Sequence, residues 1–168
     1  MSREQLVAEL GAEVRAGQAT VDALDEAVAA RLGVNRTDLR CLDLLLNELD
    51  GAATPGHLGT RLGLSTGSVT AMVDRLARLG YVTRTPDPDD RRKVVVRPTP
   101  LASRRAWELY GPIAAAGSAL LDAYTPAELR LLIDFTRSSR ELQEQYLSEV
   151  RRERTPDTDG QHPAGTPG

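Results

Sequence analysis

A tight glycine turn between two short helical segments constrains this chain more than any other feature of its sequence. Thr54-Pro55 is typical of a helix start, because threonine accepts a hydrogen bond from a free amide and proline suits the first turn. This segment ends at Gly63, and Ser65 begins a second helix that ends at Gly80. The second helix carries its apolar side chains on one face: Val69, Met72, Val73, Leu76 and Leu79. Helix, tight turn and helix together are the sequence form of a helix-turn-helix.

The hydrophobic period changes directly after this pair of helices. Residues 81–85 and 93–97 are short runs rich in β-branched side chains, and residues 86–92 between them are rich in proline and aspartate. This pattern predicts a β-hairpin with a charged tip. The predicted fold class is therefore mainly α with a small β-hairpin wing: a winged helix-turn-helix with terminal helices that dimerise.

Long amphipathic segments lie on both sides of this winged core. Residues 3–32 predict one helix, and a further helix is expected over residues 39–49, capped by Thr37 or Asp38. One face of the first helix has apolar or small residues at alternating steps of three and four: Val14, Gly17, Val21, Leu24 and Val28. That spacing is typical of a seam that packs against another helix, either in a second chain or within the monomer.

Two more threonine-proline pairs, Thr99-Pro100 and Thr125-Pro126, predict the starts of two carboxy-terminal helices. Gly111-Pro112 is expected to kink or split the first of them, as a hinge or as a static kink. The residues after Arg154 are poor in apolar side chains, which predicts a disordered tail. The expected organisation has four parts: dimerisation helix 1–36, winged DNA-binding domain 37–98, dimerisation helices 99–154 and tail 155–168.

The net charge of −3 alone argues against a nucleic-acid partner, but the charge is unevenly distributed. Residues 57–106 carry ten basic and four acidic side chains. Residues 1–56 carry five basic and ten acidic ones, and residues 107–168 carry six and ten. A basic middle between acidic flanks indicates that the winged segment binds a polyanion, here double-stranded DNA.

Small polar residues at the start of the second helix allow close approach to a major groove, because a recognition helix enters by its first turns. Arg75 follows Ser68 by two helical turns and is expected on the same side. The predicted DNA contacts are Ser65, Thr66, Gly67, Ser68, Thr70, Arg75, Arg84, Arg91, Arg92 and Lys93. The alternative for the serine-threonine run is that it only caps the helix.

The wing tip is predicted to place Arg91 or Arg92 in a minor groove, with neighbouring aspartates holding its guanidinium. Arg84 and Arg97, on the strands, are expected to reach phosphates. The alternative is a solvated turn in which the mixed charges serve solubility.

The segment from Thr54 to Val82, with its Ser65-Thr-Gly-Ser68 run, resembles the winged-helix core of the MarR family of bacterial transcription regulators. The tip Asp87-Pro-Asp-Asp-Arg-Arg92, before a valine-rich strand and the Thr99 helix start, is similar to the family's wing. The strong resemblance covers about residues 37–105. It implies a homodimer that reads a palindromic operator, usually as a repressor. It further implies a small phenolic or otherwise hydrophobic effector that binds near the second and fifth helices.

Other function classes find little support. The single cysteine, Cys41, lies among leucines and is expected to fill the core, with a redox sensor as the alternative. His57 and His162 are too few and too far apart to suggest a metal site. The sequence shows no catalytic constellation, so we expect a protein that is not an enzyme and that needs no cofactor. The chain carries no long apolar run, which predicts a cytoplasmic protein without membrane contact. A winged helix that binds another protein is the remaining alternative.

Overall fold

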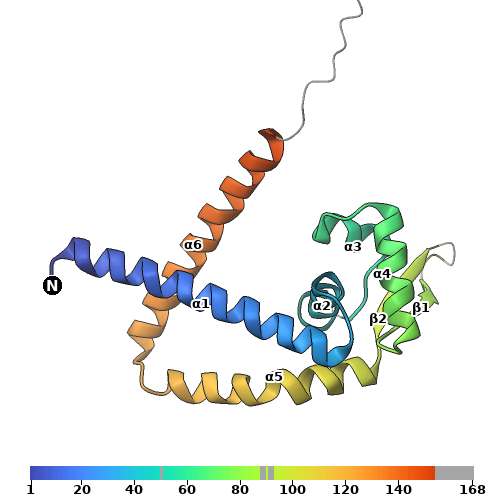
Figure 1. The fold of residues 1–168 in the computed structure, drawn as a ribbon, viewed down its shortest axis with the longest axis horizontal. Coiled ribbons are helices and arrows are strands. Elements are labelled where there is room, and N and C mark those ends of the chain that lie inside the picture. Colours follow the sequence, from blue (N-terminus) through green and yellow to red (C-terminus); the bar gives the residue numbers. More distant parts are fainter. Residues whose placement is uncertain (50, 88–89, 91–92, 154–168) are drawn as a thin grey trace, which may run out of the picture. The chain divides into compact units, whose positions relative to one another are not determined.

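The computed structural model describes residues 1–49, 51–87, 90 and 93–153. The elements are α1 (Arg3–Leu32), α2 (Arg36–Asp43), the π-helical turn η1 (Leu44–Glu48), α3 (Pro55–Leu62), α4 (Thr66–Arg78), β1 (Val82–Pro86), β2 (Val94–Pro98), α5 (Pro100–Leu121) and α6 (Pro126–Glu153), as Figure 1 shows. The chain divides into two compact units, Met1–Ala114 and a second that begins at Ala115. The mainly helical fold with a two-stranded wing is thus confirmed.

The helix-turn-helix forms through the caps that the sequence predicts. The Thr54 hydroxyl accepts a hydrogen bond from the His57 amide at 3.2 Å, and the Ser65 hydroxyl accepts one from the Ser68 amide at 3.3 Å. Gly63 ends α3 in the left-handed conformation, with φ of 68°. Because each signal acts within four residues, local chemistry alone fixes the turn between α3 and α4.

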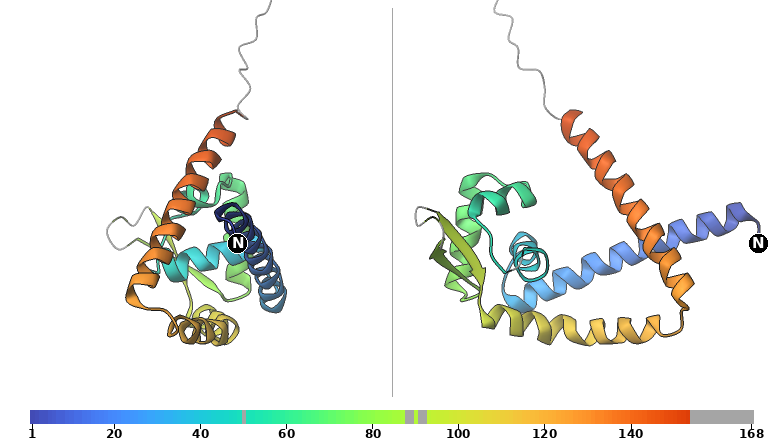
Figure 2. Two further views of the ribbon diagram at one scale, coloured as in Figure 1. Left: turned by 90° about the vertical axis from the view of Figure 1, so that its left-hand side faces the viewer. Right: turned by 180° about the vertical axis from the view of Figure 1, so that it is seen from behind.

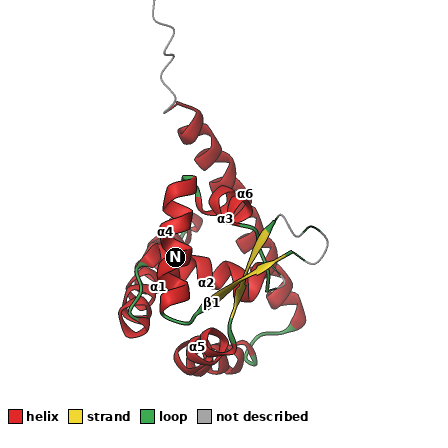
Figure 3. Cartoon of the chain, turned by 90° about the vertical axis from the view of Figure 1, so that its right-hand side faces the viewer, coloured by secondary structure: helices red, strands yellow, loops and turns green. Residues whose placement is uncertain are grey.

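The wing is an antiparallel hairpin in which Val82 lies opposite Pro98 and Pro86 opposite Val94 (Figure 3). Both strands begin one residue later than the pattern predicts. Ala53, in the loop before α3, adds a bridge to the second strand: its amide donates to the Val96 carbonyl at 3.0 Å and its carbonyl accepts from the Val96 amide at 2.8 Å. The wing is therefore hydrogen-bonded to the chain on both sides of the helix pair.

A junction of hydrogen bonds joins the wing to three helices. The Thr99 hydroxyl donates to the Gly80 carbonyl at 2.7 Å and accepts from the Ala102 amide at 3.3 Å. The Tyr81 hydroxyl donates to the carbonyl of Leu32, the last residue of α1, at 3.0 Å. The ends of α1 and α4 and the start of α5 therefore meet at the base of the hairpin.

The hydrophobic core lies inside the winged lobe, within the first unit. Its fully buried apolar members come from α2, η1, α3, α4 and β2: Cys41, Leu45, Leu58, Val69, Met72, Val73, Leu76 and Val96. Only the carboxy-terminal end of α1 joins this core, through Val28, Ala29 and Leu32. Figure 2 shows the amino-terminal part of α1 extending away from the lobe.

The predicted seam on α1 is therefore divided between two environments. Val28 is buried in the lobe and Leu24 packs against the core, whereas Val14 and Val21 are exposed. The alternative of packing within the monomer thus applies to the carboxy-terminal end of the seam.

Two local expectations were wrong. Asn35, rather than Thr37 or Asp38, caps α2: its side chain accepts from the Asp38 amide at 2.9 Å, and Asp38 returns a bond to the Asn35 amide at 3.2 Å. Three residues within four positions, Asn35, Thr37 and Asp38, can each cap a helix, and the reciprocal bond selects the first of them.

The second is a split of α5 at Pro112, which is absent because the helix runs unbroken from Pro100 to Leu121; a kink within it stays a prediction. Gly111 has no Cβ to clash with the proline ring. The carbonyl of Glu108, which loses its helical donor to Pro112, belongs to an exposed turn where water can satisfy it.

The second unit contains α6, which begins with a reciprocal cap between Thr125 and Glu128. The Thr125 hydroxyl also donates to the Glu128 carboxylate at 2.7 Å, and this bond, together with the one from the Thr125 amide, lowers the pKa of that carboxyl. Large apolar side chains remain exposed along α6, as a later section describes. No helix in the described ranges combines the length and the apolar character needed to cross a bilayer. The predicted tail, 155–168, lies outside the described residues.

Candidate nucleic-acid interface

The first turns of α4 present small polar residues to solvent. Ser65, Thr66, Gly67, Ser68 and Thr70 are all exposed, and the buried face of the same helix is Val69, Met72, Val73 and Leu76. A Cβ added at Gly67 would meet nothing within 4 Å. No side chain of the described protein thus covers this end of the helix, which leaves it open to close approach by a partner.

The hydroxyls on this surface are already oriented by local bonds. The oxygens of Ser65 and Ser68 lie 2.9 Å apart, and Thr70 donates to the Thr66 carbonyl at 3.0 Å. Whichever of Ser65 and Ser68 donates within the pair, the other can turn its hydrogen outward, and Ser68 and Thr70 each keep a lone pair for a further donor. The capping function of Ser65 is therefore real, and it is compatible with contact to DNA.

The Arg75 side chain is engaged by a buried residue of α2. Its guanidinium donates twice to Asp38, from Nε to Oδ2 at 2.7 Å and from Nη2 to Oδ1 at 2.6 Å. The Asp38 side chain is completely buried, whereas that of Arg75 is 37% exposed. This bidentate pair ties α4 to α2 and keeps the buried carboxylate satisfied. A base contact by Arg75 remains a prediction, and it would have to share or replace this pair.

Arg84 connects the wing to α4. It forms an ion pair with Asp74, and its second terminal nitrogen donates to the Thr70 carbonyl at 3.4 Å. The guanidinium therefore lies beside the exposed face of α4. This position is compatible with a phosphate contact by Arg84, which stays a prediction.

The described part of the wing tip is organised by its aspartates. The Asp87 carboxylate accepts from the Asp90 amide at 3.1 Å, and Lys93 lies 3.7 Å from the Asp90 carboxylate. Lys93 itself is exposed. Arg91 and Arg92, one of which is predicted to enter the minor groove, lie outside the described residues.

The predicted DNA contacts omit one arginine on the exposed face of α4. Arg78 is exposed and, in the ranges that the structure covers, has no carboxylate within ion-pair distance. It lies on the same exposed side of α4 as Thr70 and Asp74, at helical steps of four and eight from Asp74 and Thr70. Arg78 follows Thr70 by eight residues, so helical spacing counted from Thr70 rather than from Ser68 would have predicted Arg78 on this face. Arg97, on β2, is likewise exposed.

Cys41 is not placed for redox chemistry. It is fully buried, and burial together with the nearby charge of Asp38 raises the pKa of its thiol to about 12. Because the thiolate is the reactive form, we expect native Cys41 to resist a thiol reagent at neutral pH and to react rapidly in denaturant. Mass spectrometry after alkylation measures this, and rapid labelling of the native protein would restore the redox alternative.

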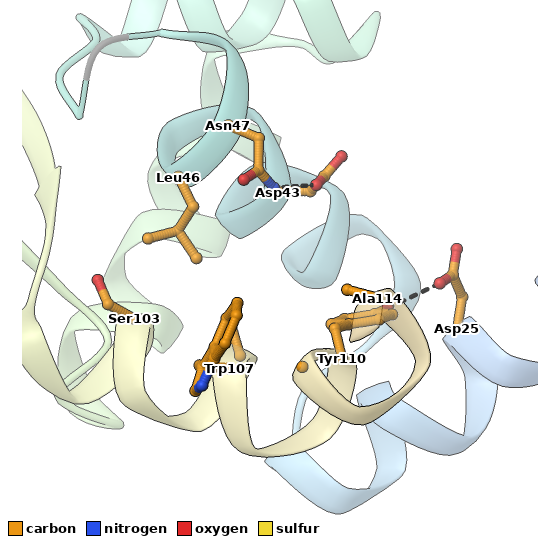
Figure 4. A pocket seen from close by; sticks show the side chains of 10 residues that line it. Asp25, Asp43, Leu46, Asn47, Ser103, Trp107, Tyr110 and Ala114 are labelled. Atoms are coloured by element: carbon orange, nitrogen blue, oxygen red, sulfur yellow. Dashed lines mark hydrogen bonds between the residues drawn. The ribbon is translucent and has the colours of Figure 1, made fainter. Parts of the chain in front are cut away.

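A cavity of about 530 Å³ opens beside the winged lobe, within the first unit. Figure 4 shows Leu46 and Asn47 on one side of it and Ser103, Trp107 and Tyr110 of α5 on the other. Asp25 of α1 and Asp43 of α2 also line the cavity, and they are its charged lining residues. The Tyr110 hydroxyl donates to Asp25 at 2.7 Å, and Asn47 donates to Asp43 at 2.7 Å. Burial, the bond to Asp25 and the charges of Asp25 and Asp43 all raise the pKa of Tyr110, so its hydroxyl stays protonated.

Known proteins with similar sequences are transcription regulators. Residues 32–93 match the profile of the MarR family. YcgE, an uncharacterised HTH-type transcriptional regulator of Bacillus subtilis, is 41% identical over 126 residues, which cover 75% of this chain and 80% of YcgE. YetL, an HTH-type transcriptional repressor of the same species, is 25% identical over 60% of each chain.

Solved structures show the same fold. A MarR family protein from Bacillus stearothermophilus superimposes with a TM-score of 0.59 at 24% identity, covering 88% of this chain and 99% of that one. The overall fold is therefore shared with a solved MarR family protein.

Proposed function

This chain belongs to the MarR family of helix-turn-helix transcription regulators, and from that premise we propose that it acts as a homodimer that binds a palindromic operator and represses transcription until a small ligand releases it. The observation that carries the proposal is the exposed, polar amino end of α4 beside a wing that Arg84 connects to it. A recognition helix and a wing on one side of a lobe can contact a major groove and the adjoining backbone together. The name of YetL supports a repressor.

Exposed apolar residues on both terminal helices support a dimer. On α1 these are Leu6, Val7, Leu10, Val14 and Val21. On α6, one stripe at steps of four, seven and four is formed by Leu131, Phe135, Leu142 and Tyr146. Apolar surface on such a scale is unfavourable in water and is typical of helices that pack against another chain. Two-fold symmetry would separate the reading helices by about 34 Å, one turn of DNA, and so requires a palindromic site.

The proposed contacts divide by function. Ser65, Thr66, Gly67, Ser68 and Thr70 approach base edges and phosphates at the start of α4. Lys93, Arg84, Arg91 and Arg92 supply the wing's charge, and Arg78 adds a cation on the exposed face of α4. Arg75 is assigned chiefly to positioning, because its pair with Asp38 holds α4 against α2.

The cavity between α2 and α5 is the proposed effector site, in the region where the family resemblance places a ligand. Its wall includes Asp25 of α1, which is the helix that also carries exposed apolar residues away from the lobe. A ligand that fits the cavity in only one arrangement of these helices would favour that arrangement and so change DNA affinity.

Binding to a library of randomised duplexes, followed by gel shift at increasing salt, tests the proposal. We expect a two-fold symmetric sequence to be enriched. A dimer that neutralises about six phosphates should lose roughly a thousandfold in affinity between ~50 and ~200 mM salt, because counterions are released on binding. Absence of any enriched sequence would contradict DNA recognition and favour the protein-interaction alternative.

A further inference from the structure

The charge of the cavity beside α5 selects the chemical class of its occupant. Of the residues that line it, Asp25 and Asp43 carry formal charge and both are acidic. Neither has a cation within 4.0 Å among the described residues. Arg40 lines a smaller, inner continuation of about 90 Å³ and forms no ion pair with either aspartate there. The lining of the outer cavity therefore carries two carboxylates and no cation, and the positive charge that acts on Asp25, that of Arg36, lies outside this lining.

Each carboxylate also has unused hydrogen-bonding capacity. Asp25 accepts from Tyr110 through Oδ1, and Asp43 accepts from Asn47 through Oδ1. In the part of the chain that the structure covers, Oδ2 of both residues has no donor. These oxygens are suited to accept bonds from a ligand that carries N–H groups and positive charge.

Trp107 supplies an aromatic surface on the α5 side of the same cavity. It is the single tryptophan of the protein, and 73% of it is exposed. Gly111 sets its orientation: a Cβ at that position would lie 3.1 Å from the Trp107 Cε2 atom. Glycine at 111 thus allows the indole to lie close along the helix, and the ring remains open to the cavity. An open indole beside carboxylates is the combination that binds organic cations.

We propose that the effector of this regulator is an organic cation with a flat apolar body, bound with its positive group toward Asp25 and Asp43 and its body against Trp107 and Leu46. That the cavity holds the effector rests on the proposed function, whereas the chemical class of the ligand rests on the residues that line the cavity. Two carboxylates are too few oxygen ligands for a hard metal ion, which takes six or more. An anionic phenolic acid would meet two negative charges with no lining cation to offset them.

Three probes of equal shape and different charge test the ligand class: benzamidinium, benzamide and benzoate. Trp107 fluorescence in the full-length protein reports binding directly. We expect affinity to fall in the order cation, neutral amide, anion, with benzamidinium at least about tenfold tighter than benzoate. Asp25→Asn and Asp43→Asn should each weaken benzamidinium about three- to tenfold and leave benzamide unchanged. Asparagine keeps an acceptor for Tyr110 and for Asn47, so both variants should fold.

Glu26→Gln is the matched control, because it removes the same charge from an exposed neighbour of Asp25 that does not line the cavity. It should leave all three affinities unchanged. Three results would each overturn the inference. They are benzoate binding as tight as that of benzamidinium, an unaltered preference for the cation in a variant that combines Asp25→Asn with Asp43→Asn, and no fluorescence change with any probe.

A gel shift in the presence of benzamidinium separates this inference from the proposed function. Cation-selective binding without release of DNA would support the ligand class and contradict ligand-controlled release. Cation-selective binding by a protein that enriches no DNA sequence would support the ligand class and contradict the proposed function.

Discussion

Replacing Arg75 with alanine should lower the free energy of unfolding by about 2–3 kcal/mol, because it leaves a fully buried carboxylate without its cation. The value lies at the lower end of the range for buried pairs, since 37% of the Arg75 side chain is exposed. Loss of the pair also frees α4 from α2, so DNA affinity should decrease together with stability. Urea denaturation followed by circular dichroism measures the first effect, and a gel shift measures the second.

Arg78→Ala is the matched control for this variant. It removes the same side chain from the same helix, but Arg78 is exposed and, among the described residues, unpaired. We expect its stability to stay within about 0.5 kcal/mol of wild type while its DNA affinity falls. Full stability of Arg75→Ala combined with a large loss of DNA affinity would contradict the positioning role and return Arg75 to direct contact with DNA. In a double-mutant cycle, Asp38→Ala and Arg75→Ala should be strongly non-additive.

Leu142→Asp should dissociate the proposed dimer. Leu142 is 68% exposed in the single chain and lies in the α6 stripe. In a two-fold dimer the substitution acts twice, and each leucine that leaves an interface costs about 1.5–3 kcal/mol before the burial of charge is counted. Dimerisation should therefore weaken by at least ~3 kcal/mol, and operator affinity should fall about a hundredfold or more, because one lobe no longer holds the other near its half-site.

Ser148→Asp adds the same charge to a different face of α6, where Ser148 donates to the Glu144 carbonyl. This control should remain dimeric and bind the operator normally. Sedimentation velocity gives the mass of each variant in solution. A Leu142→Asp protein that still sediments as a dimer would show that the stripe on α6 is not the dimer interface.

The sequence predicted those parts of the fold that depend on neighbours along the chain. The caps at Thr54 and Ser65 and the turn at Gly63 follow from bonds that span three or four residues, and all three formed as expected. The hairpin was displaced by only one residue, because alternation of side chains defines strands less sharply at their ends.

Features that join distant residues were missed. Asp38 and Arg75 are 37 positions apart, and no local pattern distinguishes an arginine that faces a buried carboxylate from one that faces solvent. Spacing predicts Arg75 on the same side of α4 as Ser68, but it could not show that a buried carboxylate of α2 lies beside Arg75. The cavity likewise depends on α1, α2 and α5 meeting, so its two unpaired aspartates appeared in the sequence as ordinary solvated charges.

The Thr99 hydroxyl fixes the first turn of α5 to the residues that follow α4. It is bonded at once to the end of α4 and to the amide of Ala102. Trp107 lies eight residues farther along the same helix, about 12 Å away at 1.5 Å per residue. The two helical turns between them are unbroken, so α5 forms a continuous connection between the indole and the base of the hairpin. We therefore expect a ligand that moves the Trp107 end of α5 to move the base of the hairpin as well, through the bonds of Thr99.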